Sequence, residues 1–259
     1  MPAERTQADI TDDAVLGGKL RLLQPRRGHR VGPDAILLAA AVPARIGEQA
    51  VDLGAGVGSA GLALAWRVGG LSVTLVEIDP ALARLATENA QRNGLDDRVS
   101  TTELDVSAPA SAFLAAGITP GSADHVLTNP PFNDPARHPA SPDSGRSRAH
   151  VARRGVLESF VTTASRLLSA RGTLTLIWRA DQLAEIMAAL TDEFGGLAIL
   201  PVHAHPDAPA IRVLLRARKG SRAPLEIYPG LVLCDASGRP TPAAETVFRD
   251  SAALDFAQV

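Results

Sequence analysis

The sequence of 259 residues is poor in cysteine and lysine, and each shortage has a consequence. A single cysteine, Cys234, excludes a disulfide within the chain and fits a reducing compartment. The six histidines lack the paired spacing of metal ligands, so no metal site is expected. Lys19 and Lys219 are the only lysines, so nearly all positive charge is arginine. Arginine counts alone therefore say little about function.

Long apolar runs are also missing. No stretch of about 18 apolar residues occurs, and the first residues are polar and acidic rather than basic and then apolar. We therefore expect a cytoplasmic protein without a membrane span. A net charge of −2 does not by itself indicate a nucleic-acid-binding protein, although local basic patches can still contact phosphates.

From residue 50 onward, short apolar runs alternate with longer helical patterns. This alternation predicts an α/β fold with a seven-stranded, mostly parallel sheet and helices on both faces. The predicted strands are 50–53, 71–77, 99–102, 123–128, 173–178, 198–203 and 211–217, and the predicted helices are 59–67, 80–93, 151–168 and 181–194. A short hairpin or strand is expected at 15–23, and a hairpin at 221–242. The polar stretch 133–150 is too long for a simple connection and predicts a functional loop.

A glycine-rich turn follows the first of these strands. Gly54, Gly56 and Gly58 let a ligand approach the backbone, and the helix that begins next offers free N–H groups. Glu77 ends the following strand, 19 residues beyond Gly58, where a carboxylate can accept the hydroxyl protons of a ribose. A solvated strand end would explain Glu77 alone, but in this context we favour ribose binding.

The nature of the cofactor is less direct, because residues 56–61 also satisfy the G-x-G-x-x-G pattern of dinucleotide-binding proteins. Asp52, just ahead of the glycines, favours S-adenosylmethionine instead. An acidic side chain suits the ammonium and sulfonium groups of that cofactor and suits a pyrophosphate poorly. A cap of the glycine loop is the alternative role for Asp52. Asp105, after the third strand, is expected either to accept from the adenine amino group of the cofactor or to cap a loop.

The tetrapeptide Asn129-Pro130-Pro131-Phe132 stands at the carboxyl end of the fourth strand, where open α/β sheets bind ligands. An exocyclic amine conjugated to a ring is a poor nucleophile, because its lone pair is delocalised. The Asn129 side-chain oxygen and the Pro130 carbonyl could accept its two hydrogens and localise that pair, while Phe132 stacks on a base. Alone, Asn-Pro-Pro could be a simple turn. Together with the glycine loop and Glu77, it predicts transfer of a methyl group to such a nitrogen.

These features resemble the class I methyltransferases with an Asn-Pro-Pro-Phe/Tyr motif, and among them the bacterial adenine-N6 methyltransferases of valine tRNA. The resemblance rests on residues 30–38, 51–58, Glu77, Asp105 and 129–132. It implies a Rossmann-like sheet of strand order 3-2-1-4-5-7-6 with the last strand antiparallel. It also implies that Asp34 and its neighbouring backbone hold the methionine part of the cofactor. Pro33 departs from the family, in which a Thr or Ser is frequent.

The same resemblance implies that the chain is one domain, residues 1–259. Residues 1–48 would be an N-terminal extension that covers the cofactor site, 49–219 the core, and 220–259 an appended segment. No insertion is large enough for a separate target-recognition region, so a structured RNA, tRNA above all, is the expected partner. Its predicted contacts lie in the loop after the tetrapeptide: Arg137, His138, Arg146, Arg148 and His150.

Two further basic clusters are weaker candidates for RNA binding. They are Arg26, Arg27 and Arg30, and the set Arg212, Arg216, Arg218, Lys219 and Arg222. Three other functions stay open from the sequence: methylation of glutamine N5 in a protein, methylation of a small-molecule amine, and a non-catalytic module that binds RNA or the cofactor.

Overall fold

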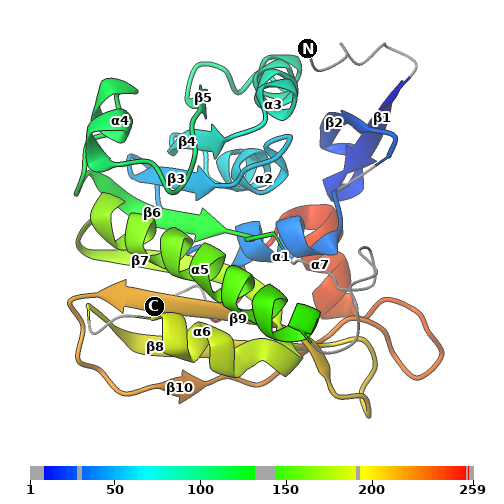
Figure 1. Ribbon diagram of the computed structural model, residues 1–259. Helices are drawn as coiled ribbons and strands as arrows, with labels where there is room; N and C mark the ends of the chain where they lie inside the picture. Colours follow the sequence, from blue (N-terminus) through cyan, green and yellow to red (C-terminus); the bar gives the residue numbers. More distant parts are fainter. Residues whose placement is uncertain (1–8, 28–30, 132–143, 191–192, 255, 257–259) are drawn as a thin grey trace.

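The computed structural model describes residues 9–27, 31–131, 144–190, 193–254 and 256, and of residues 144–154 it describes the backbone. Most of them build one sheet with helices on both faces, which confirms the expected α/β fold (Figure 1). The strands are β1 Ile10–Val15, β2 Leu20–Pro25, β3 Gln49–Leu53, β4 Ser72–Glu77, β5 Val99–Glu103, β6 Ala123–Thr128, β7 Leu168–Arg179, β8 Phe194–His203, β9 Ala210–Lys219, β10 Glu226–Ile227 and β11 Leu231–Val232. The helices are α1 Pro33–Ala41, α2 Ser59–Arg67, α3 Pro80–Arg92, α4 Ala110–Ala115, α5 Ser144–Leu167, α6 Leu183–Ala189 and α7 Pro242–Asp250.

The main sheet runs in the order β10-β8-β9-β7-β6-β3-β4-β5, with β11 also paired to β8. The five strands from β7 to β5 in this order are parallel to their neighbours. Strand β9 is antiparallel to both β7 and β8. The seven predicted strands therefore follow the expected order 3-2-1-4-5-7-6 with an antiparallel seventh strand. The prediction of seven strands was too low, because the described part of the chain contributes nine strands to this sheet.

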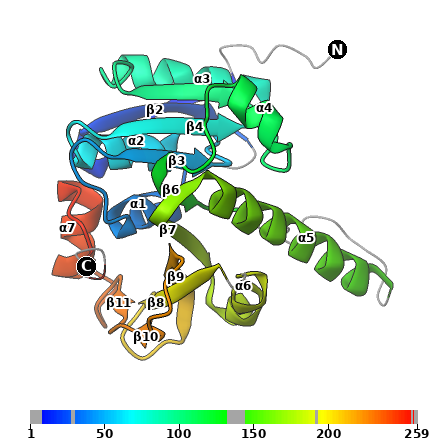
Figure 2. The same ribbon diagram turned by 90° about the vertical axis from the view of Figure 1, so that its left-hand side faces the viewer.

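Side chains of successive strand residues point to opposite faces of the sheet, and two separate cores result. Leu214 packs in one core, while its neighbours Val213 and Leu215 pack in the other. The first core contains apolar residues of α1, α2, α3 and α7, and the second contains those of α4, α5 and α6 (Figure 2). Since helices cover both faces, a ligand can reach the parallel strands at their carboxyl ends.

The N-terminal hairpin is present but longer than predicted. Strands β1 and β2 pair from Ile10 opposite Pro25 to Val15 opposite Leu20, so the predicted segment 15–23 holds the turn and most of one arm. Leu20 and Leu22 are fully buried in the same core as α1 and α2. The hairpin thus lies against α3 as a packed part of the molecule (Figure 1).

The C-terminal segment contains a shorter hairpin than the one predicted at 221–242, with an antiparallel bridge between Cys234 and Pro240. Strands β10 and β11 pair in parallel with β8 rather than with each other. Helix α7 follows, with Thr241 as its N-cap, and contacts α1. The division of one domain into residues 1–48, 49–219 and 220–259 stays a prediction.

Two other boundaries were wrong. The helix expected at 181–194 ends at Ala189, because Phe194 already pairs with Lys219 in the sheet. Residues 144–150 of the predicted loop belong to α5, whereas residues 133–143 lie outside the described part of the chain. Among the described residues, no helix is both long and apolar enough to cross a membrane, and no group of three His, Cys, Asp or Glu side chains is placed to hold a metal ion.

Candidate cofactor and catalytic site

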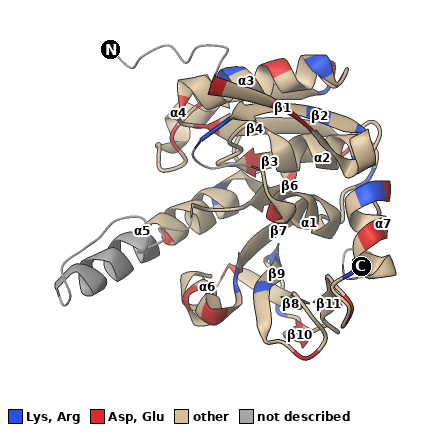
Figure 3. Cartoon of the chain, turned by 90° about the vertical axis from the view of Figure 1, so that its right-hand side faces the viewer, with Lys and Arg blue, Asp and Glu red and all other residues tan. Residues whose placement is uncertain are grey.

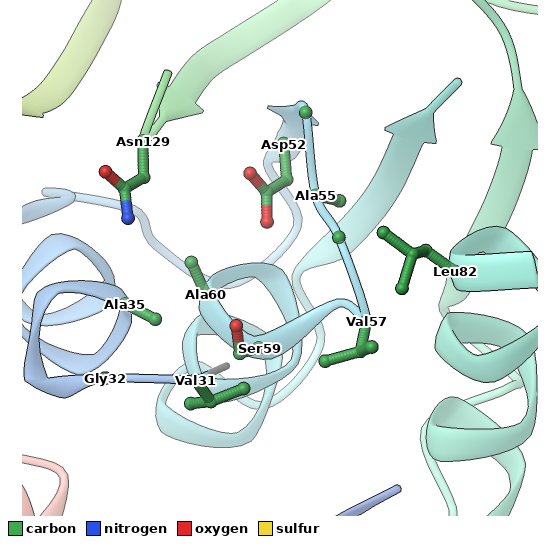
Figure 4. A pocket seen from close by; sticks show the side chains of 12 residues that line it. Val31, Gly32, Ala35, Asp52, Ala55, Val57, Ser59, Ala60, Leu82 and Asn129 are labelled. Carbon is green, nitrogen blue, oxygen red and sulfur yellow. The ribbon is translucent and has the colours of Figure 1, made fainter. Parts of the chain in front are cut away.

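A pocket opens at the carboxyl ends of β3 and β6. Figure 4 shows Asp52 and Asn129 on neighbouring strands, with their side chains directed into it. The lining residues are Val31, Gly32, Ala35, Asp52, Gly54, Ala55, Gly56, Val57, Ser59, Ala60, Leu82 and Asn129. The fold therefore brings together four predicted site residues, namely Asp52, Gly54, Gly56 and Asn129.

The glycine loop owes its shape to residues with positive φ. Gly56 has φ 60°, lines the pocket, and offers open space where a Cβ would stand. Gly58 has φ 85°, and a Cβ there would lie 2.9 Å from Leu75 Cδ1. Residues with a Cβ adopt such φ values at a cost, which glycine avoids. Gly56 thus leaves room for a ligand, whereas Gly58 leaves room for the sheet.

Asp52 is a buried carboxyl group, 2% exposed, at the base of the pocket. Its Oδ2 accepts a hydrogen bond from the Gly61 backbone N–H at 2.8 Å, so it holds the first turn of α2 as well as facing the pocket. The pKa of Asp52 is raised to about 7, chiefly by burial; the hydrogen bond from the Gly61 N–H lowers it and the charge of Glu77 raises it, and both are smaller effects. A cation in the pocket would favour the ionised carboxylate.

Glu77 holds the glycine loop from the next strand. Its Oε2 accepts from the Gly56 N–H at 2.7 Å and its Oε1 accepts from the Asp79 N–H at 2.9 Å. Each carboxylate oxygen has two lone pairs, so both can still accept a hydroxyl hydrogen. The structure adds a loop-positioning contact that the sequence did not predict, and the ribose role of Glu77 stays a prediction.

Two predicted cofactor ligands make other contacts. Asp34 Oδ2 pairs with Arg212 Nε at 2.8 Å, while the adjacent Val31 and Gly32 line the pocket. Asp105 Oδ1 accepts from both the N–H and the hydroxyl of Ser107, at 2.7 and 2.8 Å, which is the loop-capping alternative. Neither carboxylate lines the pocket. Their roles toward the cofactor stay predictions.

Asn129 follows β6 and presents an unsatisfied acceptor. Its Oδ1 is buried and has no hydrogen-bond partner in the described part of the chain. The preceding residue, Thr128, donates its hydroxyl to the Leu53 carbonyl at 2.8 Å and so fixes the end of β6 against the end of β3. Pro130 is buried and Pro131 is exposed, whereas Phe132 lies outside the described residues. A buried acceptor without a partner is costly unless a ligand donates to it.

The structure describes only some of the residues predicted to contact RNA. Arg137 and His138 lie outside the described residues, and Arg146, Arg148 and His150 belong to the part of α5 described by its backbone. Arg30 is also outside them. Elsewhere, Lys and Arg alternate with Asp and Glu on α3 and α7 (Figure 3).

The basic cluster on β9 does not form one exposed surface. Arg212 pairs with Asp34, Arg216 is buried with its guanidinium carbon 4.8 Å from the ring centroid of Phe256, and Lys219 Nζ donates to the Ser165 and Leu168 carbonyls. These three side chains serve the fold.

Sequence reasoning missed two buried amides beside the pocket. Asn89 of α3 donates to the Val57 carbonyl in the glycine loop at 3.0 Å. Gln24 of β2 accepts from the Val31 N–H at 2.8 Å. The signal for Asn89 was present, because it shares the buried face of α3 with Ala86 and Ala90 and is the polar member of that face. Gln24 offered no comparable pattern.

Comparison with known proteins agrees with this geometry. The chain matches the methyltransferase small domain over residues 29–204. A tRNA1(Val) (adenine(37)-N6)-methyltransferase of Porphyromonas gingivalis is 33% identical over 161 residues, which is 61% of each chain. The enzyme of the same name from Dickeya chrysanthemi is 28% identical over 232 residues, 87% of this chain and 88% of the other. The match thus spans less than two thirds of the first relative's length.

A solved structure extends the likeness. The crystal structure of a predicted O-methyltransferase from Agrobacterium tumefaciens is 33% identical and superimposes with a TM-score of 0.73, covering 85% of this chain and 98% of that one. The Rossmann-like fold and the choice of S-adenosylmethionine over a dinucleotide are thereby confirmed. The chain belongs to the methyltransferase small domain family.

Proposed function

We propose that this protein transfers a methyl group from S-adenosylmethionine to the exocyclic N6 amino group of an adenine in a structured RNA, a tRNA. The observation that carries the proposal is the buried Oδ1 of Asn129 in the pocket, which has no hydrogen-bond partner among the residues that the structure describes. The tRNA methyltransferases named above support adenine as the acceptor. They make adenine 37 of valine tRNA the first substrate to test.

The residues of the pocket fit the methyl donor. Gly56 leaves open space beside the loop, and Asp52 offers a buried carboxyl group whose ionised form an ammonium or sulfonium group would favour. Ile78, 60% exposed directly after Glu77, offers an apolar surface that an adenine ring could cover. Once bound, S-adenosylmethionine supplies an electrophilic methyl group. Asp52, Glu77 and the glycine loop would hold it in place.

The acceptor nitrogen would be oriented by the end of β6. The Asn129 Oδ1 and the Pro130 carbonyl accept its two hydrogens, so the lone pair points at the methyl carbon and away from ring conjugation. The nitrogen–carbon bond forms as the carbon–sulfur bond breaks, and the nitrogen then releases one proton to water. No protein side chain becomes covalently attached.

An oxygen acceptor fits this site less well. A hydroxyl group needs a base to take its proton, and the described residues lining the pocket include one carboxylate, Asp52, whose Oδ2 already accepts from Gly61. A conjugated amine needs acceptors rather than a strong base, and Asn129 supplies one. The neutral amide therefore favours nitrogen over oxygen.

The test uses the full-length protein, labelled S-adenosylmethionine and a valine tRNA transcript. We expect N6-methyladenosine in the digested RNA, and none from a transcript with guanosine at position 37. Asn129→Ala should lower kcat about 100-fold or more while the cofactor Kd stays within twofold. Asn93→Ala, an asparagine remote from the pocket, serves as the control. Unchanged activity of Asn129→Ala would refute the mechanism.

The same labelling experiment separates the alternatives. Label that enters protein rather than RNA would indicate glutamine methylation, and label in the small-molecule fraction would indicate a metabolite amine or hydroxyl. Cofactor binding without transfer to any fraction would leave a non-catalytic binding module.

A further inference from the structure

Strand β2 pairs with β1 along one edge, and two side chains of α3 bind the backbone of its other edge. The Asn89 side chain accepts from the Leu23 N–H at 2.7 Å and donates to the Leu23 carbonyl at 3.0 Å. Asn93 makes the same two contacts with Arg21, at 3.0 and 2.8 Å. Four helical residues rise about 6 Å and two strand residues about 6.7 Å, so the two asparagines match the strand spacing. They fix the register of the hairpin on α3.

The two asparagines differ in their remaining N–H group. Asn89 is 0% exposed and donates it to the Val57 carbonyl, at 3.0 Å. Asn93 donates it to the Asn89 backbone carbonyl within its own helix, at 2.7 Å. Val57 belongs to the glycine loop and lines the cofactor pocket. Asn89 therefore joins the hairpin to the cofactor loop, and Asn93 joins the hairpin to the helix alone.

The next residue of β2 contacts a second residue that lines the pocket. Gln24 accepts from the Val31 N–H at 2.8 Å and donates to Asp13 Oδ2 at 2.7 Å. Gln24 is 3% exposed, so both contacts are shielded from water. Val31 and Val57 both border the pocket in Figure 4. A continuous series of contacts thus runs from Val57 through Asn89, β2 and Gln24 to Val31.

We propose that Asn89 is a positioning residue for the methyl donor. By holding the glycine loop and β2 together, it sets the position of Val57 relative to Val31, and both residues line the pocket. This inference rests on the proposed cofactor, and it does not depend on which molecule is methylated. Coupling of this kind is reciprocal, so the cofactor must stabilise the docked hairpin by the factor by which the docked hairpin improves cofactor binding.

The experiment compares Asn89→Ala with its matched control, Asn93→Ala, in the full-length protein. Both variants remove two hydrogen bonds to β2 and should lower Tm. The Kd for S-adenosylmethionine, measured calorimetrically without RNA, should rise about tenfold or more in Asn89→Ala and less than twofold in Asn93→Ala. Once an acceptor that the protein methylates has been found, the KM for the cofactor should be higher in Asn89→Ala than in the wild type. At saturating cofactor, kcat should stay within about threefold of the wild-type value.

A second measurement needs no variant. In the wild type, adding S-adenosylmethionine should slow hydrogen exchange of the Leu23 and Val31 amides, which Asn89 and Gln24 bind. The Arg26 amide, which donates to the Asp9 carbonyl between the ends of the hairpin, should change less. Equal losses of affinity in the two variants, or unchanged exchange at Leu23 and Val31, would overturn the coupling. Failure of the wild type to bind S-adenosylmethionine would overturn both proposals, whereas binding without RNA methylation would overturn only the proposed substrate.

Discussion

Asp52 gives the sharpest test of the cofactor site, because its burial should make the stability of the protein depend on pH. The pKa of its carboxyl rises from the ordinary value of 3.8 to about 7, chiefly through burial and secondarily through the charge of Glu77. Asp52→Asn keeps an oxygen that can accept from the Gly61 N–H and removes the charge. The variant therefore isolates the cost of ionising this buried group.

The direction of the pH dependence follows from the number of protons that the folded and unfolded states bind. Between pH 3.8 and about 7, the folded protein keeps a proton that the unfolded chain has released, so the free energy of unfolding falls as pH rises through this window. Below the window both states are protonated, and above it both are ionised. At about 1.4 kcal/mol per pH unit, the loss across the window is about 4 kcal/mol.

The assay is urea unfolding of the cofactor-free wild type and Asp52→Asn at several pH values from 4 to 8. Since the other titrating groups are common to both, the difference between the curves reports Asp52. We expect the variant to match the wild type near pH 4 and to be more stable at pH 8, by up to about 4 kcal/mol. Parallel curves at all pH values would refute the reasoning.

The affinity for the cofactor should rise with pH, whereas the stability of the cofactor-free protein should fall. A cationic ligand prefers the ionised carboxylate, so wild-type affinity for S-adenosylmethionine should rise with pH from 5 to 7 and be flat in Asp52→Asn. Calorimetry in buffers of different ionisation enthalpy would also detect the proton that the wild type releases on binding. If Asp52→Asn is more stable than the wild type and binds S-adenosylmethionine less tightly, then Asp52 contributes to cofactor binding at the expense of stability.

Two further substitutions probe the loop and the strand end. Gly56→Ala should cost about 1–2 kcal/mol of stability because of its φ of 60°, since the added methyl group meets no protein atom. The methyl group would enter the pocket, so cofactor affinity should fall by more than the stability loss explains. Thermal melting and calorimetry measure the two effects, and unchanged binding would show that Gly56 does not face the cofactor. Thr128→Val should cost about 1–3 kcal/mol by removing the buried hydrogen bond to the Leu53 carbonyl, and should lower kcat with the cofactor KM unchanged. Thr128→Ser should restore the hydrogen bond and kcat, and a kcat equal to that of the wild type in Thr128→Val would exclude the alignment role.

Local patterns were sufficient for the parallel core of the sheet. Residues 59–67 and 123–128 were predicted with the bounds that α2 and β6 have in the structure. These elements are short, strongly patterned and bounded by glycine or proline, so local chemistry decides where they end. The glycine loop and the position of Asn129 followed from the same signals, because carboxyl ends of adjacent parallel strands meet at one edge.

Contacts between distant residues decided the remainder. Phe194 ended a predicted helix because it pairs with Lys219, and β10 and β11 formed where β8 offered an open edge. Asp34 has the sequence position of a cofactor ligand, yet it pairs with Arg212, 178 positions away.

The sequence by itself determined the class of fold, the glycine loop and the place of Asn129 at the end of a strand, since each depends on residues close together in the chain. Only the tertiary structure decided which acidic groups face the pocket and how Asn89 connects β2 to the glycine loop. The physical reason is that a buried polar group must find a partner, and the chain alone does not reveal which distant residue will be within reach.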